Sequence, residues 1–505
     1  MVEFKVTRYS HFFSVAAITA KARGFRRSIA ETLIENTLTK KRGRFVQEQK
    51  RIYARRDLER EEICFHDNLW EDFYQKAQYE GFSPESFEIE EVPMYDPVSF
   101  DLNIDATPWP EQMPIIDFCI EEGKQKVVTA QPGFGKTLIS LYVAAKLGVR
   151  FAVVTLGGYE DRWVPEMYRL MGLEPKEVRS CCGCTKLYRL LREVKETGIP
   201  DVKAIFLSTA TLRDFFKNYK NGKVVGSGCE DIDPKDIWEV LGVGLRITDE
   251  AHKDFHANFI ADLYSHVPKT IYLTATLFSN QDFMKRMYEM LLPRDCRREG
   301  GKLNVYVESV RVLYRLKDPN KVRFNGGQGS YSHTAYEAWI MKEAEREKNY
   351  IEAIYKYALD QWVLTREEDH KLLVFAATIE LCQKIRDLFR QRMPDLIINS
   401  YTAGDDYQIL IDSDIIVSTI GKSGTAVDIP DLSQAIMTVA IDSPNANVQA
   451  LGRLRKPKAP REYKQVFHYF VCLDIPKHID YAKSKERLFS NRVTKVRTEH
   501  LPGVI

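Results

Sequence analysis

No apolar run in this 505-residue sequence approaches the length of a membrane span, and the sequence contains no internal repeat and no low-complexity tract. Because a helix needs about 20 apolar residues to cross a bilayer, we expect no membrane-spanning segment. The apolar stretch at residues 12–20 is short, and its basic residues, Lys21 and Arg23, come after it. A secretory signal places its basic residues first, so we expect a cytoplasmic protein.

The sequence also lacks the paired spacing of cysteines that marks a structural zinc site. Its nine cysteines are odd in number and mostly scattered, which favours reduced thiols over a disulfide framework. Cys181, Cys182 and Cys184 lie close together, and Cys229 is the nearest further thiol. Zinc binding by this group is the less favoured alternative, because the second half of a four-ligand site is missing.

There is little net charge: 73 Lys and Arg against 71 Asp and Glu give a formal +2. Taken alone, this balance argues against a polyanionic partner. The charges are unevenly placed, however, because residues 1–60 contain 15 basic and 6 acidic residues, whereas residues 61–105 contain 1 basic and 13 acidic residues. Such asymmetry between segments indicates a polyanion-facing surface in the N-terminal region.

The length allows roughly three domains. Residues 1–105 end in a stretch rich in Pro and acids, which predicts a linker. Two series of short apolar runs then alternate with helical stretches, a pattern typical of buried strands in a parallel sheet. The runs are residues 126–130, 150–155, 203–209, 245–250 and 270–276, then 371–377, 414–419, 435–441 and 466–472. We predict an α/β protein with two tandem parallel-sheet domains, 106–297 and 298–505, preceded by a small α+β domain at 1–105.

The segment AQPGFGKT, residues 130–137, lies between an apolar run and a helical stretch, the context that a phosphate-binding loop needs. Two glycines let backbone N–H groups turn toward phosphate oxygens, and the helix N-terminus adds its positive dipole. We expect Lys136 to reach the β and γ phosphates and Thr137 to coordinate Mg²⁺. An unrelated Gly-rich turn is the alternative. The residues assigned to the nucleotide are Gln131, Pro132, Gly133, Phe134, Gly135, Lys136 and Thr137.

Asp249 and Glu250 follow another apolar run, 113 residues after Lys136, and begin the sequence Asp-Glu-Ala-His. An acid at the end of a buried strand holds the Mg²⁺ that bridges the phosphates, and an adjacent acid deprotonates the attacking water. We therefore assign Asp249 to Mg²⁺ and Glu250 to general-base catalysis. The alternative interpretation is that these acids cap a helix. The phosphate-loop sequence earlier in the chain makes this alternative less favoured.

In this order the segments resemble the motifs of superfamily 2 helicases. The matches are AQPGFGKT, DEAH and TAT (residues 274–276) for motifs I to III, residues 418–430 for motif V, residues 449–456 for motif VI, STATL at 208–212 for a nucleic-acid contact, and the PEQ sequence at 110–112. The resemblance covers residues 106–505. It implies two RecA-like domains, ATP and Mg²⁺ as cofactors, and a nucleic-acid partner.

The resemblance also implies roles for single residues. They are Gln112 for adenine; His252, Thr274, Ala275 and Thr276 for coupling the nucleotide to the rest of the domain; Gly424 and Asp428 at the cleft between ATP and nucleic acid; Gln449 and Arg453 for the γ-phosphate; and Ser208, Thr209 and Thr419 for nucleic acid. The family pattern has Arg where this chain has Lys456, and Arg455 stands one position earlier. Because Lys lacks the planar fork of an arginine finger, Arg453 is our first choice and Arg455 the second.

A basic stretch at residues 40–60 is expected to contact DNA, and a solvated helix face is the alternative. Its relevant residues are Lys41, Arg42, Arg44 and Arg55, with Phe45 and Tyr53 placed to pack on bases or sugars. A compact basic region ahead of a superfamily 2 core resembles the UvsW-type branch-migration helicases of T4- and T5-like phages in size, position and character.

This resemblance implies an ATP-dependent DNA helicase or translocase that acts on forks and Holliday junctions in recombination, repair or replication, in the bacterial host cytoplasm if the chain is phage-encoded. One alternative is an RNA helicase, and another is a double-stranded DNA translocase subunit that does not separate strands. A third alternative, a DNA-binding module without ATPase activity, is disfavoured by the intact Lys136, Asp249 and Glu250.

Overall fold

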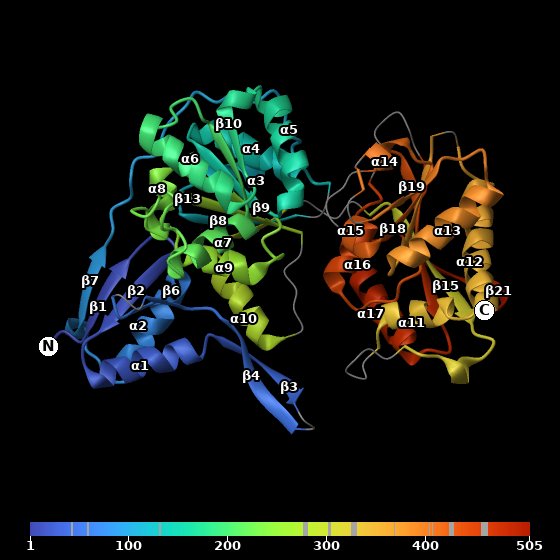
Figure 1. The fold of residues 1–505 in the computed structure, drawn as a ribbon, viewed down its shortest axis with the longest axis horizontal. Helices are drawn as coiled ribbons and strands as arrows, with labels where there is room; N and C mark the ends of the chain where they lie inside the picture. The colour runs from blue at the N-terminus through green and yellow to red at the C-terminus, as the bar shows by residue number, and fades with distance from the viewer. Residues whose placement is uncertain are drawn as a thin grey trace. The chain divides into compact units, whose positions relative to one another are not determined.

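The computed structural model describes the chain outside residues 42–43, 58–59, 131–132, 276–280, 301–304, 325–330, 368, 403–404, 407, 424–428 and 456–462, with the backbone alone described for residues 37–41, 44–47 and 422–423. Figure 1 shows the chain, which divides into two compact units, Met1–Gly301 and Lys302–Ile505. Among the described residues, no helix combines the length and the apolar character needed to cross a membrane.

The first unit begins with a small mixed sheet of strand order β5-β6-β2-β1-β7. Its elements are β1 (Phe4–Arg8), β2 (Phe12–Ala17), α1 (Ala20–Glu31), β5 (Arg55–Asp57), β6 (Glu62–His66), α2 (Trp70–Tyr79) and β7 (Phe87–Glu91). Aromatic rings form the core between the helices and this sheet. The Phe73 ring of α2 lies with its centroid 6.1 Å from that of Phe4 and 5.5 Å from that of Phe13. The expected small α+β region at the N-terminus is therefore confirmed.

The basic segment forms an antiparallel hairpin of β3 (Ile34–Lys41) and β4 (Arg44–Ile52), which pairs Lys41 with Arg44. In Figure 1 the hairpin leaves the N-terminal region as an arm. The alternative of a solvated helix face is thus wrong. Tyr53, directly after β4, is fully buried and packs edge-on against Phe259. Its ring belongs to the core, so the expectation that Tyr53 packs on nucleic acid is also wrong.

Part of the segment expected to be a linker is built into the fold. Strand β7 pairs in parallel with β1 at the edge of the small sheet. Farther along, Tyr95 Oη donates to Val243 O at 2.6 Å, and Val98 N donates to Gly242 O at 3.1 Å. The side chains of β7 are mostly exposed, because an edge strand tolerates charged residues that a buried strand does not. This is why its acidic sequence resembled a linker.

The rest of the first unit is a seven-stranded parallel sheet of order β10-β11-β9-β12-β13-β8-β14. Its strands are β8 (Gln125–Ala130), β9 (Phe151–Thr155), β10 (Val178–Cys181), β11 (Ala204–Ser208), β12 (Leu245–Thr248), β13 (Lys269–Thr274) and β14 (Arg297–Gly300). The helices are α3 (Met113–Ile120), α4 (Lys136–Leu147), α5 (Glu160–Met171), α6 (Cys184–Thr197), α7 (Thr209–Lys220), α8 (Ile237–Val240), α9 (Phe255–Asp262) and α10 (Asp282–Leu291). Because β12, β13 and β8 are neighbours, the loops that follow them lie together at the carboxyl edge of the sheet.

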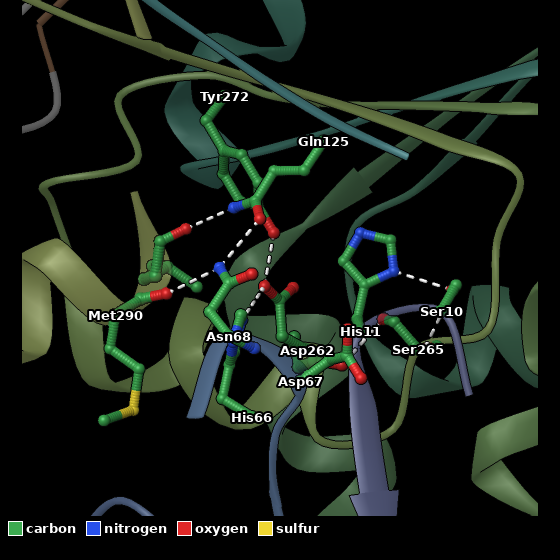
Figure 2. Close-up of polar contacts among 12 residues, drawn as sticks. Ser10, His11, His66, Asp67, Asn68, Gln125, Asp262, Ser265, Tyr272 and Met290 are labelled. Atoms are coloured by element: carbon green, nitrogen blue, oxygen red, sulfur yellow. Dashed lines mark hydrogen bonds and ion pairs between the residues drawn. The ribbon is translucent and has the colours of Figure 1, made fainter. Parts of the chain in front are cut away.

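A buried polar network joins the small sheet to the parallel sheet (Figure 2). Asp262 of α9 accepts hydrogen bonds from Arg246 and Tyr272, and its Oδ2 lies 3.1 Å from His66 Nε2 of β6. Nearby, Asn68 Nδ2 donates to Gln125 Oε1 at 2.9 Å. One hydrophobic cluster also contains residues from both sheets. The N-terminal region is therefore fixed on the parallel sheet rather than tethered to it.

The second unit contains a second seven-stranded parallel sheet, of order β17-β18-β16-β19-β20-β15-β21. Its strands are β15 (Val307–Arg315), β16 (Lys371–Ala376), β17 (Ile398–Tyr401), β18 (Ile415–Thr419), β19 (Leu432–Met437), β20 (Gln465–Cys472) and β21 (Val496–Val504). The helices are α11 (His333–Met341), α12 (Ala344–Ala358), α13 (Ile379–Arg392), α14 (Gln408–Asp412), α15 (Ile420–Ser423), α16 (Pro444–Leu451) and α17 (Pro476–Phe489). The expected pair of tandem parallel-sheet domains is confirmed.

The first unit extends slightly beyond the expected boundary at residues 297 and 298. Strand β14 continues to Gly300 and pairs with β8, so these residues complete the first sheet. The expected boundary near residue 105 stays a prediction, because the small sheet and the first parallel sheet belong to one compact unit.

Lys485 of α17 is an unusual core residue, with 3% of its surface exposed. Its Nζ lies 3.3 Å from Met437 Sδ and 4.9 Å from the centre of the Tyr469 ring, and burial lowers its pKa to about 7. We predict that Lys485→Met raises the free energy of unfolding at neutral pH by roughly 4 kcal/mol, since the pKa falls from 10.5 to about 7 and one pKa unit corresponds to ~1.36 kcal/mol.

The sign of the pH dependence follows from the lowered pKa. Below pH 7 the amine is protonated in both states, and the folded state carries the full desolvation penalty. Above pH 7 the folded state releases its proton while the unfolded state keeps it, so wild-type stability rises with pH toward that of the variant. Urea unfolding across this range measures the convergence, with the exposed Lys483→Met as control. A constant difference between wild type and Lys485→Met would contradict this prediction.

Candidate nucleotide-binding site

The phosphate loop connects β8 to α4, as expected. Lys136 begins α4, is buried, and donates from Nζ to Ala130 O at 2.8 Å. Gly133 and Gly135 have φ of 88° and 85°, a left-handed conformation that favours glycine. A Cβ on Gly135 would also lie 2.4 Å from Gln112 Nε2. Gln131 and Pro132 lie outside the described residues.

Gln112 lies before the phosphate loop in the sequence and is hydrogen-bonded to it. Its side chain is fully buried, Nε2 donates to Phe134 O at 2.7 Å, and Oε1 accepts from Trp109 N at 2.8 Å. The first bond ties the start of α3 to the loop, and the second, from Trp109, orients the amide. An amide side chain has one further donor and one further acceptor position. The role in adenine binding that the resemblance implies stays a prediction.

Asp249 and Glu250 follow β12, and β13 separates β12 from β8, the strand that leads into the phosphate loop. Asp249 Oδ1 accepts from Glu250 N at 2.9 Å, and Oδ2 accepts from Trp163 Nε1 at 3.0 Å. Glu250 has a φ of 51°, which is uncommon for a residue other than glycine. Such strained backbone conformations gather at functional sites. The hydrogen bonds orient the Asp249 carboxylate, and the backbone conformation places the Glu250 side chain.

Neighbouring cations act on this acidic pair. Burial and the charge of Glu250 raise the pKa of Asp249, and Arg162 and Lys136 oppose the rise. Burial also acts to raise the pKa of Glu250, but the nearby positive charges, first among them Lys136 and Lys253, outweigh it and lower the pKa. Glu250 is therefore the more readily ionised of the two, as a general base requires.

His252 links the acidic pair to β13. Its Nδ1 lies 2.9 Å from Thr274 Oγ1, and its Nε2 lies 3.4 Å from Glu250 Oε2. Burial lowers the pKa of His252 to about 4, so the ring is neutral at physiological pH. Ala275 follows Thr274 directly, and Thr276 lies outside the described residues. The contacts that run from Glu250 through His252 to Thr274 are those that a coupling role needs.

The residues present fit Mg²⁺ with a nucleotide. Glu250 Oε2 is buried and has no hydrogen-bond partner among the described residues. Thr137 Oγ1 and Asp249 are hard oxygen ligands, and protein sites for Mg²⁺ use one or two such groups together with substrate phosphates and water. In the described part of the chain, no group of three or more His, Cys, Asp or Glu side chains is placed to hold a metal ion by itself. Cys181, Cys182, Cys184 and Cys229 are among the residues to which this applies.

Two residues of α5 that the sequence analysis missed belong to this site. Arg162 Nη2 donates to Thr137 Oγ1 at 3.2 Å, and the fully buried Trp163 holds Asp249. They follow β9, and β9 lies beside β12 in the sheet. That adjacency is the signal that places them, and it becomes visible only once the strand order is known.

In the second unit, Gln449 lies on α16, and Arg453 follows the helix; both are buried. Arg455 is half-buried, and its carbonyl accepts a hydrogen bond from Gln465. Thr419 is the last residue of β18. Gly424 and Asp428 lie outside the described residues. The roles of these residues stay predictions.

The residues expected to contact nucleic acid divide into three groups. Ser208 caps α7 by accepting from Thr211 N at 3.1 Å, and Thr209 is buried beside it. Lys41 and Arg44 are backbone partners in the β3–β4 register, and Arg42 lies outside the described residues. Arg55 has 13% of its side chain exposed, donates to Leu263 O at 3.0 Å and stacks on Tyr264. Arg55 therefore has structural contacts, and its expected contact with nucleic acid stays a prediction.

No protein-family model and no curated protein matches the chain. Among solved structures, Mss116p bound to ssRNA and AMP-PNP aligns with a TM-score of 0.51 and 14% identity, over 78% of this chain and 75% of that chain. The Pyrococcus furiosus Hef helicase domain aligns with a TM-score of 0.44 and 15% identity, over 74% and 97%. T4 UvsW aligns with a TM-score of 0.35 and 11% identity, over 99% and 100%. The likeness to Mss116p shows that the chain has the tandem RecA-like fold.

Proposed function

We propose that the protein is an ATP- and Mg²⁺-dependent nucleic-acid helicase or translocase. The observation that carries this proposal is the continuous site formed by Lys136, Asp249, Glu250, His252 and Thr274. It combines a phosphate loop, a buried acidic pair and a hydrogen-bonded link to the next strand in one place. ATP hydrolysis needs the first two, and the link supports transmission of the nucleotide state to the rest of the unit.

Each residue has a chemical role in this proposal. Lys136 neutralises phosphate oxygens, and Thr137 and Asp249 would hold Mg²⁺, which would supply charge stabilisation to the phosphates when bound. Glu250 accepts the proton of the attacking water, and His252 fixes the orientation of the Glu250 carboxylate. From the second unit, Gln449 and Arg453 are proposed to act on the γ-phosphate, with Arg455 as the second choice for an arginine finger.

Branched DNA is the proposed substrate, and the β3–β4 hairpin supports this choice. The hairpin is a two-stranded arm whose sequence is rich in Lys and Arg. Because the region that carries it is fixed on the first parallel sheet, the arm would hold DNA in a constant position relative to that motor domain. An RNA substrate is the alternative, which the ssRNA-bound Mss116p keeps open. A double-stranded DNA translocase that does not separate strands is a further alternative.

We predict that the triple variant K41A/R42A/R44A loses about tenfold in affinity for forked DNA. The slope of log affinity against log salt should fall by roughly 2–3, because each phosphate contact contributes about 0.9. ATP hydrolysis without nucleic acid should stay unchanged, since these residues are not among those assigned to the nucleotide. Fluorescence anisotropy at several salt concentrations measures the effect. The control is K342A/K348A/K356A, which removes three exposed lysines of the second unit.

Substrate choice is tested by comparing ATPase stimulation by a fork, a Holliday junction, single-stranded DNA and RNA. The proposal predicts the strongest stimulation by the branched DNAs and strand displacement by the chain alone. Strongest stimulation by RNA would replace the DNA proposal with the RNA alternative. Stimulation by duplex DNA without displacement of a labelled strand would favour the translocase.

A further inference from the structure

Arg162 brings a positive charge into the nucleotide site from outside the helicase-like motifs. It lies in the first turn of α5, half-buried, and its Nη2 donates to Thr137 Oγ1 at 3.2 Å. The next residue, Trp163, is fully buried and donates from Nε1 to Asp249 Oδ2 at 3.0 Å. This second bond anchors the first turn of α5 against the acidic pair, so the position of Arg162 is set by the site itself.

The charges of the site explain why a cation at this place matters. Asp249 and Glu250 are both buried, and Lys136 is the one lysine of the phosphate loop. Arg162 and Lys253 are further cations near this pair, and buried carboxylates need opposite charges nearby. Arg162 also contacts Thr137 Oγ1, at 3.2 Å.

Mg²⁺ would act on the same groups. The two ligands that we assign to it are Thr137, whose hydroxyl Arg162 contacts, and Asp249, whose carboxylate accepts from the neighbouring Trp163. A guanidinium beside a divalent cation is repelled by it. Because a hydroxyl has two lone pairs, Thr137 could accept from Arg162 and bind the metal at once, so the opposition is one of charge. Arg162 and Mg²⁺ thus oppose each other at Thr137.

We propose that Arg162 is an internal counter-cation of the nucleotide site, which opposes Mg²⁺ at Thr137 and thereby sets the Mg²⁺ concentration that nucleotide binding requires. The inference rests on the proposed function and deepens it, because it assigns a regulatory residue to the same site. In this role Arg162 is a positioning residue that acts on Mg²⁺ binding through Thr137 and Asp249.

The test is a Mg²⁺ titration of N-methylanthraniloyl-ADP binding to the full chain, followed by fluorescence. Arg162→Gln keeps the length and a hydrogen-bond donor but removes the charge, and Arg162→Lys keeps the charge. The control is Arg169→Gln, because Arg169 lies on the same helix, is largely exposed and pairs with Glu166. We expect Arg162→Gln to lower the Mg²⁺ half-saturation on the order of three- to tenfold, as removal of one competing charge from a partly buried site should. Arg162→Lys and Arg169→Gln should stay near the wild type.

Three outcomes would overturn the inference. An unchanged half-saturation in Arg162→Gln would leave Arg162 as a contact that only holds α5 to α4. A higher half-saturation, or weaker ADP binding with and without Mg²⁺, would make Arg162 a phosphate ligand instead. If the wild type bound no nucleotide, the proposed function would fall and this inference with it. Nucleotide binding by the wild type therefore separates failure of the inference from failure of the function.

Discussion

Glu250→Gln should bind ATP as tightly as the wild type and hydrolyse it about a hundred- to ten-thousand-fold more slowly, the usual contribution of general-base catalysis. The amide keeps the size of the side chain and its position at the end of β12, but it cannot accept a proton from water. Glu250 Oε2 is the buried oxygen without a hydrogen-bond partner among the described residues, so it is the atom most available to that water.

The measurement is phosphate release under single-turnover conditions, together with equilibrium binding of labelled ATP. Glu196→Gln makes the same chemical change at an exposed position of α6 and should behave as the wild type. Hydrolysis by Glu250→Gln within about threefold of the wild type would show that another group is the base. Loss of ATP binding would instead show that Glu250 has a structural role.

Asp262→Ala should lower the free energy of unfolding of the first unit by about 3–5 kcal/mol, the range for breaking a buried ion pair by removing one partner. Asp262 is fully buried, and its pKa is held below its usual range by Arg246 and His66 even though burial acts to raise it. Without the carboxylate, the buried Arg246 keeps only its hydrogen bonds to Ser265 and Tyr272. These neutral partners leave its charge uncompensated.

Urea unfolding followed by tryptophan fluorescence measures this effect. Asp282→Ala, at a 95% exposed side chain, is the matched control and should change stability by less than about 0.5 kcal/mol. Because Asp262 joins β6, β12 and β13, the variant should also loosen the small N-terminal sheet, seen as faster hydrogen exchange in β1 and β2. Equal stability of Asp262→Ala and the wild type would contradict the view that this network fixes the N-terminal region.

The shared core also decides how the N-terminal region can be studied. Removal of residues 1–105 would expose the cluster that contains Val127, Phe259 and Met287. Such a truncation would then report on folding as well as on DNA binding. Point variants on the β3–β4 hairpin leave this core intact, so they are the sharper test of DNA contact.

In the two parallel sheets, the sequence predicted the strands that are apolar on both faces and missed the other five. All nine predicted runs are strands, from β8 to β20. Four of the missed strands, β10, β14, β17 and β21, are the edges of the two parallel sheets. An edge strand has one unpaired side and carries polar residues, as in the Arg-Arg-Glu-Gly sequence of β14. The fifth, β15, alternates polar and apolar residues although it lies between β20 and β21.

The candidate site was predictable where its residues are close in sequence or in a known motif. Lys136, Asp249 and Glu250 meet because they follow β8 and β12, two parallel strands of one sheet that are separated only by β13. Arg162 and Trp163 were missed because their approach depends on the β9–β12 adjacency, which no local pattern encodes. Tyr53 was misassigned because a basic, aromatic stretch has the same composition whether it faces solvent or packs on a neighbouring helix.

The measurement that tests the central claim most directly is the ATP hydrolysis rate of the full chain with and without nucleic acid. We predict at least about a tenfold stimulation by nucleic acid, because a motor couples its nucleotide state to its track. We also predict loss of hydrolysis in Lys136→Ala, since Lys136 neutralises the phosphates. A rate that does not respond to any nucleic acid, or a Lys136→Ala variant as active as the wild type, would contradict the account.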